Sequence, residues 1–195
     1  MKLALDPYMF RTVPLLELPG FVADLGYEWI ELSPREDFIP FFNHPRVDDA
    51  GVAAFRKALA SAGVGVSSVL PLFPWSGPDE EDRLAAVRYW KRAIQIASDL
   101  GADTMNSEFN GNPREAAACE RQFWKSMDEL LPEFDKAGIR LVLEPHPTTG
   151  RRTASAPSTS SEASTHRTCR SSTAHRIPST RATTATGSWT RPATC

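Results

Sequence analysis

Residues 137–147 read Ala137-Gly138-Ile139-Arg140-Leu141-Val142-Leu143-Glu144-Pro145-His146-Pro147, which joins the end of a helix to a short strand. Gly138 follows a helical pattern, and a glycine suits the left-handed residue that ends a helix. The aliphatic run after it predicts a buried strand. The two prolines stop that strand and restrict the backbone around Glu144 and His146. The stretch therefore predicts a strand that delivers a carboxylate and an imidazole at one end of a sheet.

The same order of helix, glycine and strand occurs four times along the chain. The glycines are Gly26, Gly63, Gly101 and Gly138, at spacings of 37, 38 and 37 residues. A fixed period of this length indicates an internal repeat, and the strand and helix in each period make it a βα unit.

The repeat predicts five strands and four helices. The strands are expected at 2–5, 28–32, 64–70, 103–106 and from 141 onward, and the helices at 15–25, 48–62, 79–100 and 113–136. Pro132 predicts a kink or break in the last helix. The spacing of apolar residues in the third helix predicts a core face, made of Leu84, Val87, Trp90, Ile94 and Ala97.

Parallel strands with intervening helices form either a doubly wound sheet or a βα barrel. The barrel is favoured because the polar candidates follow strands and because neither G-x-G-x-x-G nor G-x-x-x-x-G-K occurs. The predicted fold class is α/β, an incomplete TIM (β/α) barrel of about five parallel strands with four helices, followed by a disordered tail.

The composition is that of a globular protein, with 195 residues, 41% hydrophobic residues and a net charge of -2. The apolar start of the chain is too short for a signal peptide, and no run approaches the length of a membrane span. We therefore expect a cytoplasmic protein with no membrane partner. Three cysteines without CxxC spacing indicate neither a disulfide framework nor a cysteine zinc site.

The charge is divided unevenly between the two parts of the chain. Residues 151–195 contain seven arginines against one acid, a net charge of +6, so residues 1–150 carry -8. The C-terminal part is dominated by Ser, Thr, Arg and Ala and cannot bury enough apolar surface to offset the entropy of ordering it. We expect a partial barrel at 1–147 and a disordered Ser/Thr/Arg-rich tail at 148–195. Its arginines predict a solvated tail rather than a nucleic-acid surface.

In a parallel barrel the carboxyl ends of the strands share one face, where the active site is built. Those ends supply five candidates: Asp6, Glu31, Glu108, Glu144 and His146. Carboxylates and an imidazole suit a divalent cation such as Mn²⁺, Mg²⁺, Co²⁺ or Zn²⁺. They also suit proton transfer at a carbon next to a carbonyl. Glu144 is the expected metal ligand and catalytic residue, and the other four are the expected substrate contacts.

Each candidate also has a structural interpretation. Glu144 could be an acid at a strand end that forms a salt bridge, and Glu108 could be an acid in a loop. His146 could be a structural histidine. Glu31 could pair with Arg35. Two loops are rich in aromatic residues that either wall a pocket for a small polar ligand or pack in the core: Phe38, Phe41, Phe42, Phe73 and Trp75.

Five segments together resemble the sugar phosphate isomerase/epimerase family, whose fold is the xylose isomerase-like TIM barrel. They are residues 3–11 (LALDPYMFR), 27–35 (YEWIELSPR), 87–93 (VRYWKRA), 104–109 (TMNSEF) and 143–147 (LEPHP), so the resemblance covers about residues 1–147. It implies a divalent metal held by residues at the ends of strands five to eight, with Glu144 as the first ligand. It also implies proton transfer through an enediolate on a small sugar or sugar phosphate.

The sequence departs from that family after residue 147. The change to Thr148-Thr149-Gly150-Arg151-Arg152 is what a GC-rich gene gives when it is read out of frame, so a frameshifted or truncated product is expected. We then expect weak or absent metal binding, impaired isomerase activity and self-association through open sheet edges. A non-catalytic remnant or binding protein is the alternative. A zinc endonuclease-like barrel acting on abasic DNA is disfavoured, because residues 1–150 are acidic and contain only His44 and His146.

Overall fold

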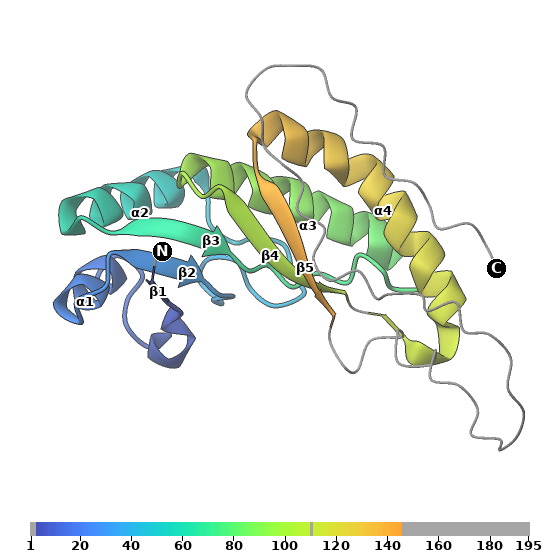
Figure 1. Ribbon diagram of the computed structural model, residues 1–195, viewed down its shortest axis with the longest axis horizontal. Helices are drawn as coiled ribbons and strands as arrows, with labels where there is room; N and C mark the ends of the chain where they lie inside the picture. The colour runs from blue at the N-terminus through green and yellow to red at the C-terminus, as the bar shows by residue number, and fades with distance from the viewer. Residues whose placement is uncertain (1–2, 110, 146–195) are drawn as a thin grey trace, which may run out of the picture.

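A computed structural model of the chain describes residues 3–109 and 111–145 (Figure 1). Five parallel strands form one sheet in the order β1-β2-β3-β4-β5. They are β1 (Ala4–Leu5), β2 (Trp29–Leu32), β3 (Gly65–Val69), β4 (Thr104–Phe109) and β5 (Arg140–Pro145). The predicted tail at 148–195 and His146 lie outside the described residues.

The strand order distinguishes the two folds that the sequence left open. Each strand pairs with the next one in the sequence, so every crossover steps in the same direction. A doubly wound sheet reverses that direction at a switch point. Right-handed crossovers that never reverse leave the helices on one face, and α2, α3 and α4 lie along one face in Figure 1. The predicted fold class, an incomplete TIM barrel, is confirmed for the described residues.

Four α-helices connect the strands, as predicted. They are α1 (Leu18–Asp24), α2 (Asp49–Ala62), α3 (Glu80–Asp99) and α4 (Ala116–Ala137), with short 3₁₀ helices η1 (Pro7–Phe10) and η2 (Pro113–Glu115). The side chain of Asp48 caps α2 by accepting from Gly51 N, and that of Asp79 caps α3. The four repeat glycines have φ between 67° and 85°, the left-handed conformation that the sequence predicted.

Some of the observed elements differ from the prediction in their ends or their continuity. Residues 14–17 form a turn in which Glu17 N and Leu18 N both donate to Pro14 O, so α1 begins at Leu18. The α4 helix is continuous across Pro132, so of the predicted kink or break the break is wrong, because buried residues on both sides, such as Leu130 and Phe134, hold one apolar face against the core. Strand β4 extends to Phe109 because its pairing with β5 continues.

The core is a layer of side chains between the sheet and the helices. At its centre the rings of Trp75 and Trp90 stack with centroids 4.3 Å apart, and Phe73 packs edge-on against Trp90. Phe38, Phe73 and Trp75 are fully buried, so for these three the packing interpretation of the aromatic loops is correct.

The N-terminal end of α3 is joined to α4 by a buried arginine. The Arg83 side chain is only 4% exposed and lies 2.9 Å from Glu80 Oε1 and 2.8 Å from Glu129 Oε1. Glu80 also accepts hydrogen bonds from Gln122 and Lys125. Arg83 thus takes the core side of this turn, and Leu84, predicted to face the core, is 40% exposed.

These hydrogen bonds make stability depend on pH. Arg83 first, then Lys125 and Gln122, lower the pKa of Glu80 from 4.5 to about 2. A carboxyl group whose pKa is lower in the folded state stabilises that state above its unfolded pKa. The contribution is therefore lost as the pH falls from about 4.5 to about 2.

We predict that Glu80→Gln lowers the free energy of unfolding at neutral pH and flattens its dependence on pH between about 4.5 and 2. Urea titrations over this pH range measure both effects. Glu120→Gln, on the exposed side of α4, is the matched control and is expected to follow the wild type. Equal pH dependence in wild type and Glu80→Gln would contradict the prediction.

Candidate active site

Alternation along the strands divides the sheet into a packed face and a polar face. In β4, Met105 and Ser107 are buried toward the helices, whereas Asn106 and Glu108 lie half-buried on the opposite face. In β5, Leu141 is buried and Glu144 is exposed on that opposite face. We call this the inner face, defined by Glu31, Asn106, Glu108, Val142 and Glu144.

Two of the predicted acids are brought together by the register of β4 and β5. Glu108 pairs with Glu144, so both carboxylates leave the same face at the same level near the carboxyl ends of the strands. Neighbouring strands lie about 4.8 Å apart, which places the two backbones within reach of one small ligand. Trp75 Nε1 donates to the carbonyl oxygen of Glu108 at 3.3 Å and ties this part of β4 to the aromatic core.

A third acid, Glu31, is held by a residue that the sequence did not single out. Asn106 Nδ2 donates a hydrogen bond to Glu31 Oε1, although β3 lies between their strands. Strands two apart are separated by roughly 10 Å, so this contact indicates that the inner face is concave and that its side chains converge. In a closed barrel, side chains from alternate strands share a layer in the same way.

The alternative interpretation, in which Glu31 pairs with Arg35, is wrong. The Arg35 guanidinium binds Asp37 through Nε and Nη2, both at 3.0 Å, and Nη2 also donates to Val13 O. Arg35 is buried in the loop that follows β2. Glu31 lies next to a β-bulge, where β3 has one extra residue opposite Ile30 and Glu31. Bulges of this kind re-aim side chains beside active sites.

Of the two other predicted site residues, Asp6 and His146, the structure describes only Asp6. Asp6 follows β1, is exposed, and accepts a hydrogen bond from Tyr8 N at 2.9 Å as the cap of η1. Its observed contact is therefore structural. His146 lies outside the described residues. The only sequence signal for Asn106 was its position two residues before Glu108, because alternate residues of a strand share a face.

The inner face offers oxygen ligands of the kind that hard divalent cations prefer. Within residues 3–109 and 111–145, however, no three Asp, Glu, His or Cys side chains lie close enough together to hold a metal ion. The described strands thus supply donors of suitable chemistry but not a complete ligand set. None of the described helices has the length and hydropathy of a membrane span.

Comparison of the sequence with models of known protein families identifies the family of this chain. The sequence model of the xylose isomerase-like TIM barrel matches residues 19–170.

Solved structures share the fold at low sequence identity. A 3-keto-D-glucoside 4-epimerase from E. coli matches with a TM-score of 0.60 and 16% identity, over 76% of this chain and 57% of its own. A sugar phosphate isomerase/epimerase from Parabacteroides distasonis gives 0.54 and 18%, over 84% and 60%. A xylose isomerase-like TIM barrel protein from Mycobacterium smegmatis, in complex with magnesium, gives 0.50 and 19%, over 71% and 50%. The chain therefore spans only 50–60% of the length of these proteins.

We predict that Glu31 and Asn106 are energetically coupled. A double-mutant cycle with Glu31→Ala and Asn106→Ala should give about 1 to 2 kcal/mol in the free energy of unfolding, as expected for a half-buried hydrogen bond to a charged group. Urea denaturation of the four proteins measures it.

Asn43 provides the matched control, because its amide donates to Phe41 O and does not contact Glu31. The cycle of Glu31→Ala with Asn43→Ala should therefore be additive within about 0.5 kcal/mol. A Glu31–Asn106 coupling no larger than this would show that the contact contributes nothing.

Proposed function

Because the chain belongs to the xylose isomerase-like TIM barrel family, we propose that it carries part of the active site of a sugar isomerase or epimerase. The reaction is transfer of a proton through an enediolate on a ketose or polyol-derived substrate, a small sugar or sugar phosphate. The observation that carries the proposal is the register of Glu108 with Glu144 on the inner face. The E. coli and Parabacteroides neighbours, by their names, act on sugars.

The two carboxylates fit two different roles in such a reaction. Glu144, exposed at the end of β5, takes or returns the proton at the carbon next to the carbonyl group. Glu108, half-buried one strand away, accepts hydrogen bonds from substrate hydroxyl groups. Glu31 acts through Asn106, because their hydrogen bond fixes the plane of the Asn106 amide beside Glu108. Asp6 and His146 are further proposed substrate contacts.

We further propose that Glu144 is one ligand of a divalent cation, Mn²⁺, Mg²⁺, Co²⁺ or Zn²⁺. Such an ion would polarise the substrate carbonyl and stabilise the enediolate charge. The magnesium complex of the Mycobacterium smegmatis neighbour supports the choice of a hard cation. With few ligands from its own strands, this chain should bind the ion weakly and be impaired in turnover.

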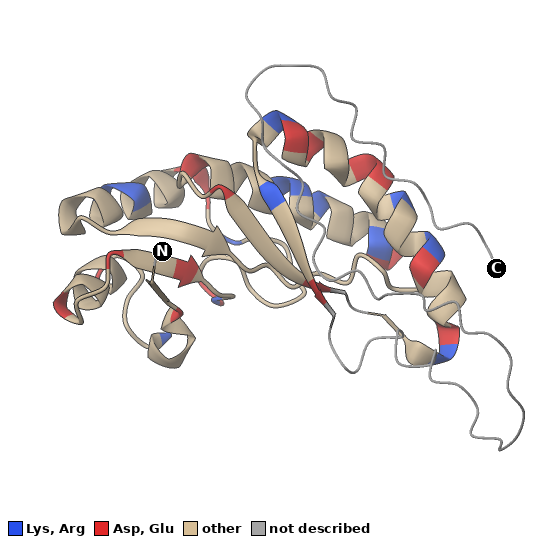
Figure 2. Ribbon diagram, in the orientation of Figure 1, with Lys and Arg blue, Asp and Glu red and all other residues tan. Residues whose placement is uncertain are grey.

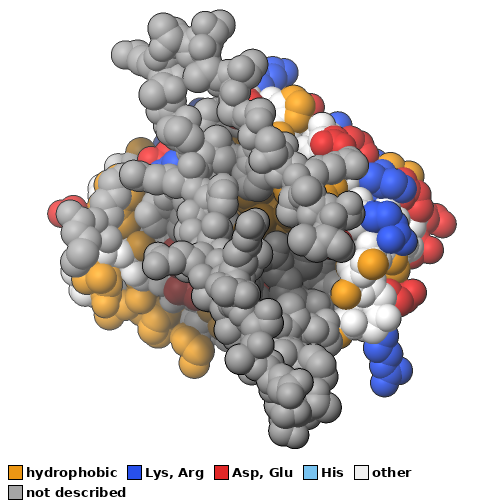
Figure 3. Space-filling model, turned by 45° about the vertical axis from the view of Figure 1, so that its right-hand side comes forward, with side chains coloured by type: hydrophobic (Ala, Val, Ile, Leu, Met, Phe, Trp, Pro, Cys, Tyr) orange, Lys and Arg blue, Asp and Glu red, His pale blue; other side chains and the backbone are white. Residues whose placement is uncertain are grey.

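The sheet edges lead to a second part of the proposal. Among the described strands, β1 and β5 each have one neighbour, and Leu3, Tyr8 and Met9 beside β1 expose apolar surface. Figure 3 shows hydrophobic side chains gathered at the lower left, where η1 and α1 lie in Figure 1. We propose that these open edges, in a partial barrel spanning 1–147, promote open-ended association.

We predict that the 195-residue chain binds Mn²⁺ with a dissociation constant on the order of 0.1 to 1 mM, as expected for a site with few ligands. Glu144→Gln should weaken binding about tenfold, because it removes a charged oxygen donor, whereas Glu108→Gln, at a proposed substrate contact, should weaken it less. Electron paramagnetic resonance of free Mn²⁺ measures it, with Glu120→Gln on α4 as the control. Unchanged binding by Glu144→Gln would remove that residue from the site.

Activity is tested separately, by following deuterium incorporation from D₂O into ketoses in the presence of Mn²⁺. Little or no exchange is expected from this chain. Rapid exchange that Glu144→Gln abolishes would refute the impairment and support the assigned role of Glu144.

A further inference from the structure

The two halves of the helical layer differ in their exposed surfaces. In Figure 2 the ribbons of α3 and α4 are coloured for acidic and basic residues along much of their length, whereas most of the ribbon of α2 is coloured for neither. The exposed residues of α2 include four alanines, Ala50, Ala53, Ala54 and Ala60. The other exposed residues of α2 are Asp49, Arg56, Lys57 and Ser61, so alanines make up half of the residues on this exposed surface, which we call the ridge.

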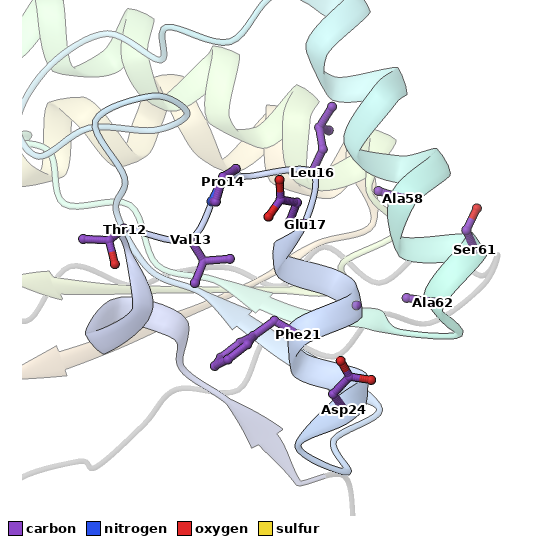
Figure 4. A pocket seen from close by; sticks show the side chains of 11 residues that line it. Thr12, Val13, Pro14, Leu16, Glu17, Phe21, Asp24, Ala58, Ser61 and Ala62 are labelled. Carbon is purple, nitrogen blue, oxygen red and sulfur yellow. The ribbon is translucent and has the colours of Figure 1, made fainter.

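A groove lies beside that ridge, between α1 and the C-terminal half of α2 (Figure 4). Its volume is about 860 Å³. Leu16 and Phe21 contribute apolar surface on the α1 side, while Ala58 and Ala62 line it from α2. Leu16 is 54% exposed, and no candidate active-site residue lines the groove.

Gly20 lines the groove without a side chain, although the described fold does not require a glycine there. A Cβ atom built at Gly20 meets no other atom within 4 Å, and its φ is not in the left-handed region. Glycine is less favourable than alanine inside a helix. The absent side chain therefore leaves space next to α1 that nothing in the described residues fills.

The charges around the groove are complementary within one face. Glu17 and Asp24 line it on α1, and Arg56 and Lys57 project from the exposed side of α2. None of these four side chains forms an ion pair with any residue in the described part of the chain. One surface thus carries a ridge with two positive charges and a groove with two negative ones.

We propose that this face is the interface of a twofold dimer of the chain, in which α2 of each copy lies in the groove of the other. A twofold interface uses the same patch on both subunits. With a ridge and a groove on one face, the ridge of each subunit can therefore contact the groove of the other. Alanines on the ridge and Gly20 in the groove let the helices approach closely. Arg56 and Lys57 of one copy then meet Glu17 and Asp24 of the other. The dimer is independent of the proposed enzymatic function.

The test is a charge exchange on the full chain, followed by sedimentation velocity from micromolar to millimolar concentration at low salt. The wild type should dimerise through this face, in addition to any association through the sheet edges. Reversal of the acids (Glu17→Lys with Asp24→Lys) and of the bases (Arg56→Glu with Lys57→Glu) should each raise the dissociation constant at least about tenfold, because like charges then face each other. The fourfold variant, which has the wild-type net charge, should restore the dimer.

Two controls separate this interface from other contacts. Glu120→Lys with Asp135→Lys makes the same change in net charge on α4 and should leave the dimer intact. Gly20→Ala should retain or raise the melting temperature while weakening the dimer, since the added methyl group enters the groove. Far-UV circular dichroism confirms that each variant is folded.

Three results of the sedimentation experiments would overturn the proposed dimer. A monomer at every concentration overturns the proposal, and so does open-ended association that ignores both charge reversals, because the sheet edges then account for it. An effect of the acid reversal alone, without rescue in the fourfold variant, also overturns it, since the groove then receives a basic segment other than α2.

Discussion

The pairing of each parallel strand with the next one in the sequence is the constraint on which the rest of the structure depends. Because no crossover reverses direction, α2, α3 and α4 lie along one face of the sheet, and no helix of the described residues crosses the other face. Alternation along each strand then sends Met105 and Leu141 into the core and Glu108 and Glu144 away from it. The fold thereby separates the residues that pack in the core from the acids proposed for the site.

Local signals in the sequence predicted the elements but not all of their ends. The repeat glycines act within a few residues of the helix ends, so Gly63 and Gly138 were recognisable without knowledge of the fold. The length of β4 depends on its partner β5, whose register no local pattern specifies. The burial of Arg83 in place of Leu84 depends likewise on Glu129, which lies 46 residues away.

The same difference explains how much of the candidate site could be predicted. Glu31, Glu108 and Glu144 were recognisable as acids at strand ends, and the shared edge of a parallel sheet places them together. The hydrogen-bond partner of Glu31 could not be recognised from the sequence. Arg35 is close in sequence, whereas Asn106 is 75 residues away and reaches Glu31 only through the curvature of the sheet. Closeness in the sequence favoured Arg35 as the partner of Glu31, but the register of β2, β3 and β4 places Asn106 there instead.

The inner face is electrostatically unfavourable by itself. Glu108 and Glu144 stand opposite each other on adjacent strands, an arrangement that costs stability because like charges repel. Glu31 has a hydrogen-bond donor in Asn106, but no described ion pair includes Glu108 or Glu144. The fold can bear this cost because its stability comes from the other face, where Trp75 and Trp90 stack in a fully buried cluster. This pair of carboxylates, which the packing on the other face tolerates, is compatible with the cation or polyhydroxylated substrate that we propose for the site.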